Sequence, residues 1–217
     1  MLTSTLLNEV LLASLETLYM ISLSGFFSML LGLPLGLVLF TTKPKGIHPN
    51  PWVFQTLSLL SNIFRSIPFI ILLALLIPLT RLIVGSSIGS SATIVPLTIG
   101  AIPFFAKLTQ NVFDELPSGL IDAGTAFGAT PVQIIKHILI PDALPALINA
   151  MTVTMVTLVS YSAMAGAIGG GGLGALAIDY GYQRFEFSVL ITTVIILIVL
   201  VQSLQYVGDK TARYFTH

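Results

Sequence analysis

Long apolar runs, separated by short polar stretches, dominate the chain. A helix of about 20 apolar residues crosses a hydrocarbon layer roughly 30 Å thick, and several runs reach that length. The pattern predicts an all-α, polytopic membrane protein in which residues 1–217 form a single domain with five membrane spans. The expected spans cover about residues 15–40, 53–79, 91–113, 146–168 and 187–207.

Small residues and prolines interrupt these runs. Residues 1–14 are expected to form a short amphipathic or interfacial segment before the first span. The first span contains residues that allow close helix packing and a kink near one end, namely Gly25, Gly32, Pro34 and Gly36. We expect the third span to be broken by three residues of the same kinds, Pro96, Gly100 and Pro103.

The composition agrees with a membrane protein and excludes several functions. Of the residues, 55% are hydrophobic and 8% are charged, and the mean hydropathy is +0.97, unlike a soluble domain. The net charge of zero leaves no basic surface for nucleic acid. The absence of cysteine excludes disulfides, thiolate metal sites and cysteine catalysis. The first basic residue is Lys43, so the charged start of a cleavable signal peptide is missing.

The second span carries a polar stripe. Its polar residues recur at intervals of three and four, which places them on one helical face: Gln55, Ser58, Asn62, Arg65 and Ser66. Such a face should lie against protein or a wet cavity. Arg65 is the one cation deep within an apolar run. It either snorkels to the headgroups, pairs with backbone carbonyls or lines a translocation path, and the third possibility makes Asn62 and Arg65 candidate pathway residues.

The fourth span is rich in hydroxyl groups. One of its faces carries four further candidate pathway residues, Thr154, Thr157, Tyr161 and Met164. This face suits a subunit interface or a translocation path, but packing between helices is the favoured explanation for any single hydroxyl.

The segments after the fourth span are polar. Residues 169–174 read GGGGLG, but no Lys-Ser or Lys-Thr follows and no strand precedes them, so they do not form a phosphate-binding loop. A flexible or tightly packed turn is expected instead. We expect residues 175–185 to be a polar connector and the last residues, GDKTARYFTH, to be a short charged tail.

Residues 118–141, SGLIDAGTAFGATPVQIIKHILIP, form a polar-edged island between apolar runs and predict a helical hairpin. Ser118 can cap its first helix, and Gly128 can end that helix in the left-handed conformation. The second helix is expected to begin with a capping box in which the N-cap, N1 and N3 positions are Thr130, Pro131 and Gln133. Pro141 is expected to stop it.

The hairpin resembles the cytoplasmic "EAA" loop of ABC-importer permeases. Asp122-Ala123-Gly124 stands for the Glu-Ala-Ala triplet, Gly128 for the glycine and Ile138-Leu139-Ile140-Pro141 for the closing Ile-x-Leu-Pro. Three positions depart from the pattern: Asp122, Gly124 and Ile140. Gly124 costs the first helix about 1 kcal/mol relative to Ala. The resemblance implies that nine residues couple the chain to an ATPase: Asp122, Ala123, Gly124, Gly128, Ala129, Thr130, Pro131, Ile138 and Pro141. A surface hairpin without a partner is the alternative.

The basic residues predict the orientation in the membrane. With the N-terminus outside and the C-terminus in the cytoplasm, the cytoplasmic side holds Lys43, Lys45, Lys107, Lys136, Lys210 and Arg213. Only Arg81 and Arg184 lie outside, in agreement with the positive-inside rule. This orientation places the hairpin in the cytoplasm, where an ATPase can reach it.

Missing motifs argue against catalysis in this chain. It contains neither a phosphate-binding loop with its lysine nor a His-Glu-x-x-His helix, and no Ser/His/Asp constellation is evident. Its carboxylates cluster at span ends and in loops, and inverted repeats are not visible, which disfavours an ion-coupled carrier. We therefore expect a component of a passive or externally powered pore, not an enzyme.

Four segments extend the resemblance over nearly the whole chain. NIFRSIPFIILL (62–73), IVPLTIGAIPF (94–104), GATPVQIIKHILIP (128–141) and YSAMAGAIGGGGLG (161–174) resemble the methionine-uptake permeases of ABC importers. The similarity is weakest over residues 1–14 and the tail.

The family implies a permease in the bacterial inner (cytoplasmic) membrane that imports methionine, in the L- and D-forms. It implies a homodimer of five-helix subunits, two ABC ATPase subunits that bind ATP and Mg, and an external methionine-binding lipoprotein. No cofactor is expected in this chain. Alternatives are an importer for another small solute, or an ion-coupled carrier or membrane scaffold that needs no ATPase.

Overall fold

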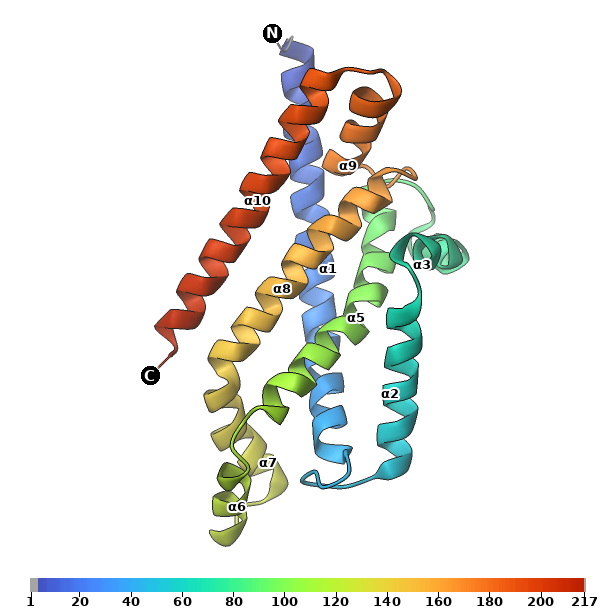
Figure 1. The fold of residues 1–217 in the computed structure, drawn as a ribbon. Coiled ribbons are helices and arrows are strands. Elements are labelled where there is room, and N and C mark those ends of the chain that lie inside the picture. Colours follow the sequence, from blue (N-terminus) through green and yellow to red (C-terminus); the bar gives the residue numbers. More distant parts are fainter. Residues whose placement is uncertain (1–3, 217) are drawn as a thin grey trace.

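The computed structural model describes residues 4–216 and is built from helices (Figure 1). The elements are α1 (Ser4–Thr42), α2 (Pro51–Ser66), α3 (Phe69–Leu75), α4 (Ile77–Val84), α5 (Ser90–Asp114), α6 (Gly119–Ala126), α7 (Pro131–Ile134), the π-helix η1 (Ile135–Leu139), α8 (Ile140–Gly166), α9 (Gly172–Leu176), the π-helix η2 (Ala177–Gln183) and α10 (Phe187–Tyr214). Four continuous helices are long and apolar enough to cross a membrane, and the bent pair α2–α3 supplies a fifth crossing if it counts as one span. The predicted all-α membrane architecture is confirmed.

The first helix is longer than expected. Residues 4–14 continue α1 instead of forming a separate interfacial segment, so that prediction was wrong; residues 1–3 lie outside the described part. Val10 and Ala13 are buried in a core with residues of α9 and α10, and this packing extends the helix. The helix also continues through Pro34. At Gly36, an added Cβ would lie 2.5 Å from the Ala106 carbonyl oxygen, so the predicted close packing is confirmed.

The second expected span is broken. α2 and α3 meet at an angle of 103° across Ile67 and Pro68, and α4 follows. Ile67 adopts an extended conformation with φ −80° and ψ 123°, because the proline ring disfavours the helical conformation in the preceding residue. The expected span over about residues 53–79 is therefore bent, and its crossing of the membrane as one span stays a prediction.

The third expected span shows the opposite behaviour. α5 runs without a break through Pro96, Gly100 and Pro103, and both prolines are buried. α5 lies beside α1 and α8 (Figure 1), and neighbouring helices allow a membrane helix to tolerate the lost hydrogen bonds. The predicted breaks are absent from this helix.

Pro141 does not stop the helix in which it lies. α7, η1 and α8 form one uninterrupted helix from Pro131 to Gly166. Just before Pro141 the hydrogen-bond ladder widens, because the Ile140 amide donates to the Ile135 carbonyl five residues back. The π-helical turn accommodates a proline that has no amide hydrogen. The prediction that Pro141 ends the second hairpin helix was wrong, and the fourth span continues the hairpin.

The glycine run forms a tightly packed turn, which is one of the two expected alternatives. Gly169, Gly171 and Gly172 have positive φ angles of 89°, 77° and 72°. The following residues are helical, in α9 and η2, so the expected polar connector over residues 175–185 was wrong. α1 caps this helix from outside: the Gly172 amide donates to Glu16 Oε2 at 2.7 Å, and the Leu173 amide donates to Thr17 Oγ1 at 2.9 Å.

The C-terminal segment is also helical. α10 continues to Tyr214, so most of the expected charged tail extends the last helix. The hairpin of α6 and α7 lies at one end of the molecule, and α9 and the start of α1 lie at the other (Figure 1). α10 descends from the N-terminal end toward the hairpin end.

We expect Thr17→Val to lower the stability of the protein more than Thr193→Val. Both threonines are buried and bond to their own helix, but only Thr17 also accepts the Leu173 amide. Valine at position 17 leaves that buried amide without a partner, at a cost of about 1–3 kcal/mol. Thermal unfolding in detergent measures the difference. Equal midpoints for the two variants would refute the role of Thr17 in holding α9.

Candidate functional site

The turn of the hairpin is fixed by hydrogen bonds typical of a helix C-terminus. Gly128 has φ +75° and directly follows the last residues of α6. Its amide donates to the Thr125 carbonyl at 2.9 Å, and the Ala129 amide donates to the Gly124 carbonyl at 3.0 Å. This pair of bonds is a Schellman motif, and it requires a left-handed residue at position 128. The expected role of Gly128 as the end of the first helix is confirmed.

The start of the second helix also follows the prediction. The Gln133 amide donates to Thr130 Oγ1 at 3.4 Å, and the Gln133 side chain contacts the Thr130 backbone amide at 2.8 Å, which completes the capping box. Pro131 occupies the first turn of α7. Ser118 does not act as a side-chain cap, because its backbone is helical and its hydroxyl makes no capping bond to α6. That part of the prediction was wrong.

The inner face of the hairpin is anchored to the membrane helices. Ile134 and Leu139 are fully buried in a cluster with Phe40 at the end of α1 and Phe113 at the end of α5. The two phenylalanine rings lie 5.4 Å apart between centroids. Lys43 forms an ion pair with Asp114, which ties the end of α1 to the residue from which the hairpin departs. The hairpin is therefore packed against the ends of these two helices.

Gly124 lies at a close contact within the hairpin. An added Cβ would lie 2.9 Å from Ile134 Cγ1 and 3.1 Å from Ile138 Cδ1. An alanine at this position would force the side chains of Ile134 and Ile138 to shift. This contact gives a physical reason for the departure from the Glu-Ala-Ala pattern at this position.

The outer face of the hairpin exposes two apolar side chains that the sequence reasoning missed. Phe127 is 91% exposed and Val132 is 70% exposed. The sequence could have predicted their exposure, because both residues flank the Gly128 turn in a polar-edged stretch. Of the nine predicted coupling residues, Gly124 is buried, Ala129 and Ile138 are half-buried, and the others are exposed: Asp122, Ala123, Gly128, Thr130, Pro131 and Pro141. Exposed apolar groups beside a rigid turn can bind a partner subunit.

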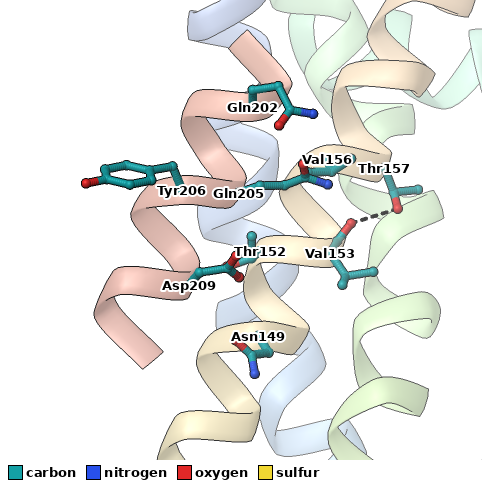
Figure 2. A pocket seen from close by; sticks show the side chains of 9 residues that line it. All are labelled: Asn149, Thr152, Val153, Val156, Thr157, Gln202, Gln205, Tyr206 and Asp209. Carbon is teal, nitrogen blue, oxygen red and sulfur yellow. Dashed lines mark hydrogen bonds between the residues drawn. The ribbon is translucent and has the colours of Figure 1, made fainter. Parts of the chain in front are cut away.

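A groove of about 600 Å³ separates α8 from α10 (Figure 2). Asn149, Thr152, Val153, Val156, Thr157, Gln202, Gln205, Tyr206 and Asp209 line it. Figure 2 shows Gln205 and Asp209 pointing from α10 toward α8, whereas the ring of Tyr206 points away. Lipid cannot solvate a polar solute. Amide, hydroxyl and carboxylate groups on two membrane helices can do so in its place.

Most of the groove was not predicted. Only Thr157 belongs to the candidate pathway residues, and its hydroxyl donates to the Val153 carbonyl at 2.8 Å. Gln202, Gln205 and Asp209 recur at intervals of three and four on the last span. The same periodicity identified the polar stripe on the second span, so it could have identified this face.

The structure separates the candidate pathway residues of α8. Thr154 is buried and donates to the Ala150 carbonyl at 2.8 Å, which fits the packing interpretation. Thr157 lines the groove, Tyr161 lines a second cavity, and Met164 is 48% exposed near the opposite end of the helix. Arg65 lines the same cavity as Tyr161, and Asn62 is exposed one turn before Arg65 on α2. Contact of any of them with a substrate stays a prediction.

The chain is a bundle of candidate membrane-spanning helices with a hairpin at one end, and the outer face of the hairpin is exposed. The family described as "Binding-protein-dependent transport system inner membrane component" matches residues 28–214. The chain belongs to this family, and it is therefore an inner-membrane transport component rather than an enzyme.

Relatives with high identity carry more specific names. The chain is 50% identical over 208 residues to the probable D-methionine transport system permease protein MetI of Vibrio cholerae, covering 96% of this chain and 92% of the relative. It is 56% identical over 151 residues to the D-methionine transport system permease protein MetI of Escherichia coli K12, covering 70% of each. A solved structure of the MetNI methionine ABC transporter in an inward-facing conformation superimposes with a TM-score of 0.97 at 48% identity, covering 99% of this chain and 100% of the solved chain.

An amino acid ABC transporter structure, described with histidines, is 19% identical with a TM-score of 0.78 and covers 95% of this chain and 94% of its own; it shares the fold.

Proposed function

We propose that this chain is the permease subunit of an ATP-driven methionine importer. Two copies form the membrane pore, two ABC ATPase subunits bind their hairpins, and an external lipoprotein delivers methionine. The names and identities of the relatives support methionine as the substrate. ATP and Mg bind the ATPase, because this chain lacks a phosphate-binding loop.

The continuity of the helix from Pro131 to Gly166 is the observation that carries the mechanism. Its first turns belong to the hairpin, and its middle, from Asn149 to Thr157, lines the polar groove. These two parts are about 15 residues, or roughly 22 Å, apart along one continuous helix. When the ATPases close, each hairpin moves as a lever, and α8 changes the width of the groove against α10 without a flexible joint between them.

The proposed orientation places the hairpin in the cytoplasm and the N-terminus outside. The basic residues support it, since Lys43 and Lys136 belong to the hairpin end and Arg184 belongs to the end that carries α9. In this orientation the groove between α8 and α10 lies toward the cytoplasmic half. The groove is where methionine leaves, with Thr157, Gln202 and Gln205 replacing water around its charged groups.

ATP-dependent uptake of labelled methionine into liposomes tests the proposal. The chain is reconstituted with its ATPase and the binding lipoprotein, and L- and D-methionine are compared. We expect uptake of both enantiomers that stops without ATP. A complex that hydrolyses ATP and moves neither enantiomer would exclude methionine as the substrate, and failure to bind any ATPase would exclude the importer mechanism.

A further inference from the structure

A second cavity lies where the broken span bends. It has a volume of about 220 Å³ and is separate from the groove between α8 and α10. Its walls come from α2, α3, α5 and α8, at Phe64, Arg65, Ile67, Phe69, Leu72, Gly100, Phe104 and Tyr161. The cavity lies at the 103° bend between α2 and α3, with Arg65 before the bend and Phe69 after it.

Arg65 supplies the one charge in this cavity. Among the side chains that the structure describes, the only ion pair joins Lys43 to Asp114, and no hydrogen bond from the Arg65 guanidinium is formed in that part of the chain. A guanidinium within a membrane segment is costly to insert, and such residues mark substrate pathways or bind partners. Arg65 is exposed, and none of the residues that line the cavity carries a carboxylate, so its guanidinium is open to an anion that enters the cavity.

The other walls of the cavity are aromatic and aliphatic. The Tyr161 ring stacks on the Phe69 ring with 4.3 Å between centroids and 3° between planes, which fixes Tyr161 at the edge of the space. Phe64, Phe104 and Leu72 complete the apolar part. Aromatic rings make favourable contacts with thioether sulfur. A small molecule that fits this cavity therefore has one anionic group and an apolar arm.

We propose that the cavity between Arg65 and Tyr161 is a transit subsite that recognises the carboxylate of an apolar amino acid. The inference rests on the proposed import of methionine and assigns a position to it. Arg65 donates two parallel N–H bonds to the carboxylate, a geometry that guanidinium favours. The side chain of the amino acid lies against Phe64 and the Phe69–Tyr161 pair. Since the walls carry no acidic group, the ammonium group stays in the wet part of the path.

Charge restoration at position 65 tests the subsite. The chain contains no cysteine, so an Arg65→Cys variant has one thiol in this subunit. The variant is reconstituted with the ATPase and the binding lipoprotein, and it reacts with either a cationic ethylammonium or an anionic ethylsulfonate methanethiosulfonate. We expect at least a tenfold loss of methionine uptake in the variant and a severalfold recovery with the cationic reagent only. Excess L-methionine should slow the reaction, whereas methioninol, which has no carboxylate, should not.

Three controls keep the result interpretable. Wild-type complexes treated with both reagents report on thiols in the partner subunits. Arg81→Cys removes a cation outside the cavity, whose guanidinium donates to Ser87 Oγ at 3.3 Å, and we expect it to leave uptake near the wild-type level. If Arg65→Cys fails to co-purify with the ATPase, Arg65→Lys keeps the charge but loses the planar fork, and it should lower uptake severalfold.

Different failures overturn different proposals. Wild-type uptake of methionine together with full uptake by Arg65→Cys would overturn the subsite alone. Recovery with both reagents, or no protection by methionine, would also overturn it, because either result means that the side chain fills space or pairs with another part of the complex. Absence of methionine uptake by the wild-type complex would overturn the proposed function, and the subsite with it.

Discussion

Replacing Gly128 with valine is expected to abolish coupled transport while the membrane helices still fold. Gly128 has φ +75°, a conformation that costs an L-residue about 1–2 kcal/mol and a β-branched residue more. No atom lies within 4 Å of the position of an added Cβ, so the strain comes from the backbone alone. Relief of this strain opens the Schellman motif and turns α6 away from α7. Uptake should fall at least tenfold. ATP hydrolysis should either continue without transport or disappear because the ATPase no longer binds.

Gly119→Val is the matched control. Gly119 lies in the same hairpin, its φ is not left-handed, and an added Cβ there also meets no atom within 4 Å. Both variants add the same side chain to open space, and only one strains the turn. Intact, coupled transport by the Gly128→Val variant would refute the lever mechanism. Equal losses in both variants would assign the effect to added bulk instead of the turn.

Prolines show how much of the fold the sequence could predict. Apolar runs located the membrane helices, because hydropathy is a property of each segment by itself. The prolines in these runs have opposite effects that no local rule separates: Pro68 breaks a span, whereas Pro96 and Pro103 lie within one helix. The two prolines of α5 are buried between helices, and Pro68 is exposed. Contacts that form only in the folded bundle decide between the two outcomes.

The same division applies to the candidate site. The turn at Gly128 and the Thr130–Gln133 capping box were predictable, because each depends on residues within one or two turns of helix. The α9 helix was not, because its first amides bond to Glu16 and Thr17, which are 156 residues away along the chain. The groove needs α8 and α10 together, so the polar periodicity of either helix describes only one wall. The cavity at Arg65 depends on a bend that was not expected.

Phe127→Ala is expected to weaken ATPase binding more than any other single substitution on the surface of the hairpin. Phe127 is 91% exposed at the turn, and Val132 lies exposed on the other side of it. An aromatic side chain on a rigid, protruding turn can fill a pocket of a partner, and loss of such a contact typically costs 2 kcal/mol or more, about a 30-fold change in affinity. The membrane helices should be unaffected, because Phe127 belongs to none of the buried clusters that the structure describes.

Binding of the purified ATPase to the permease in nanodiscs measures the effect. Phe187→Ala is the matched control: Phe187 is 67% exposed at the start of α10, at the opposite end of the molecule. We expect the control to bind with wild-type affinity and the Phe127→Ala variant to bind at least 30-fold more weakly, with a corresponding loss of uptake. Equal affinity of the two variants would mean that Phe127 lies outside the interface. In that case the exposed polar face around Asp122 and Thr130 would have to carry the contact, because no other large apolar group besides Val132 is exposed on the described hairpin.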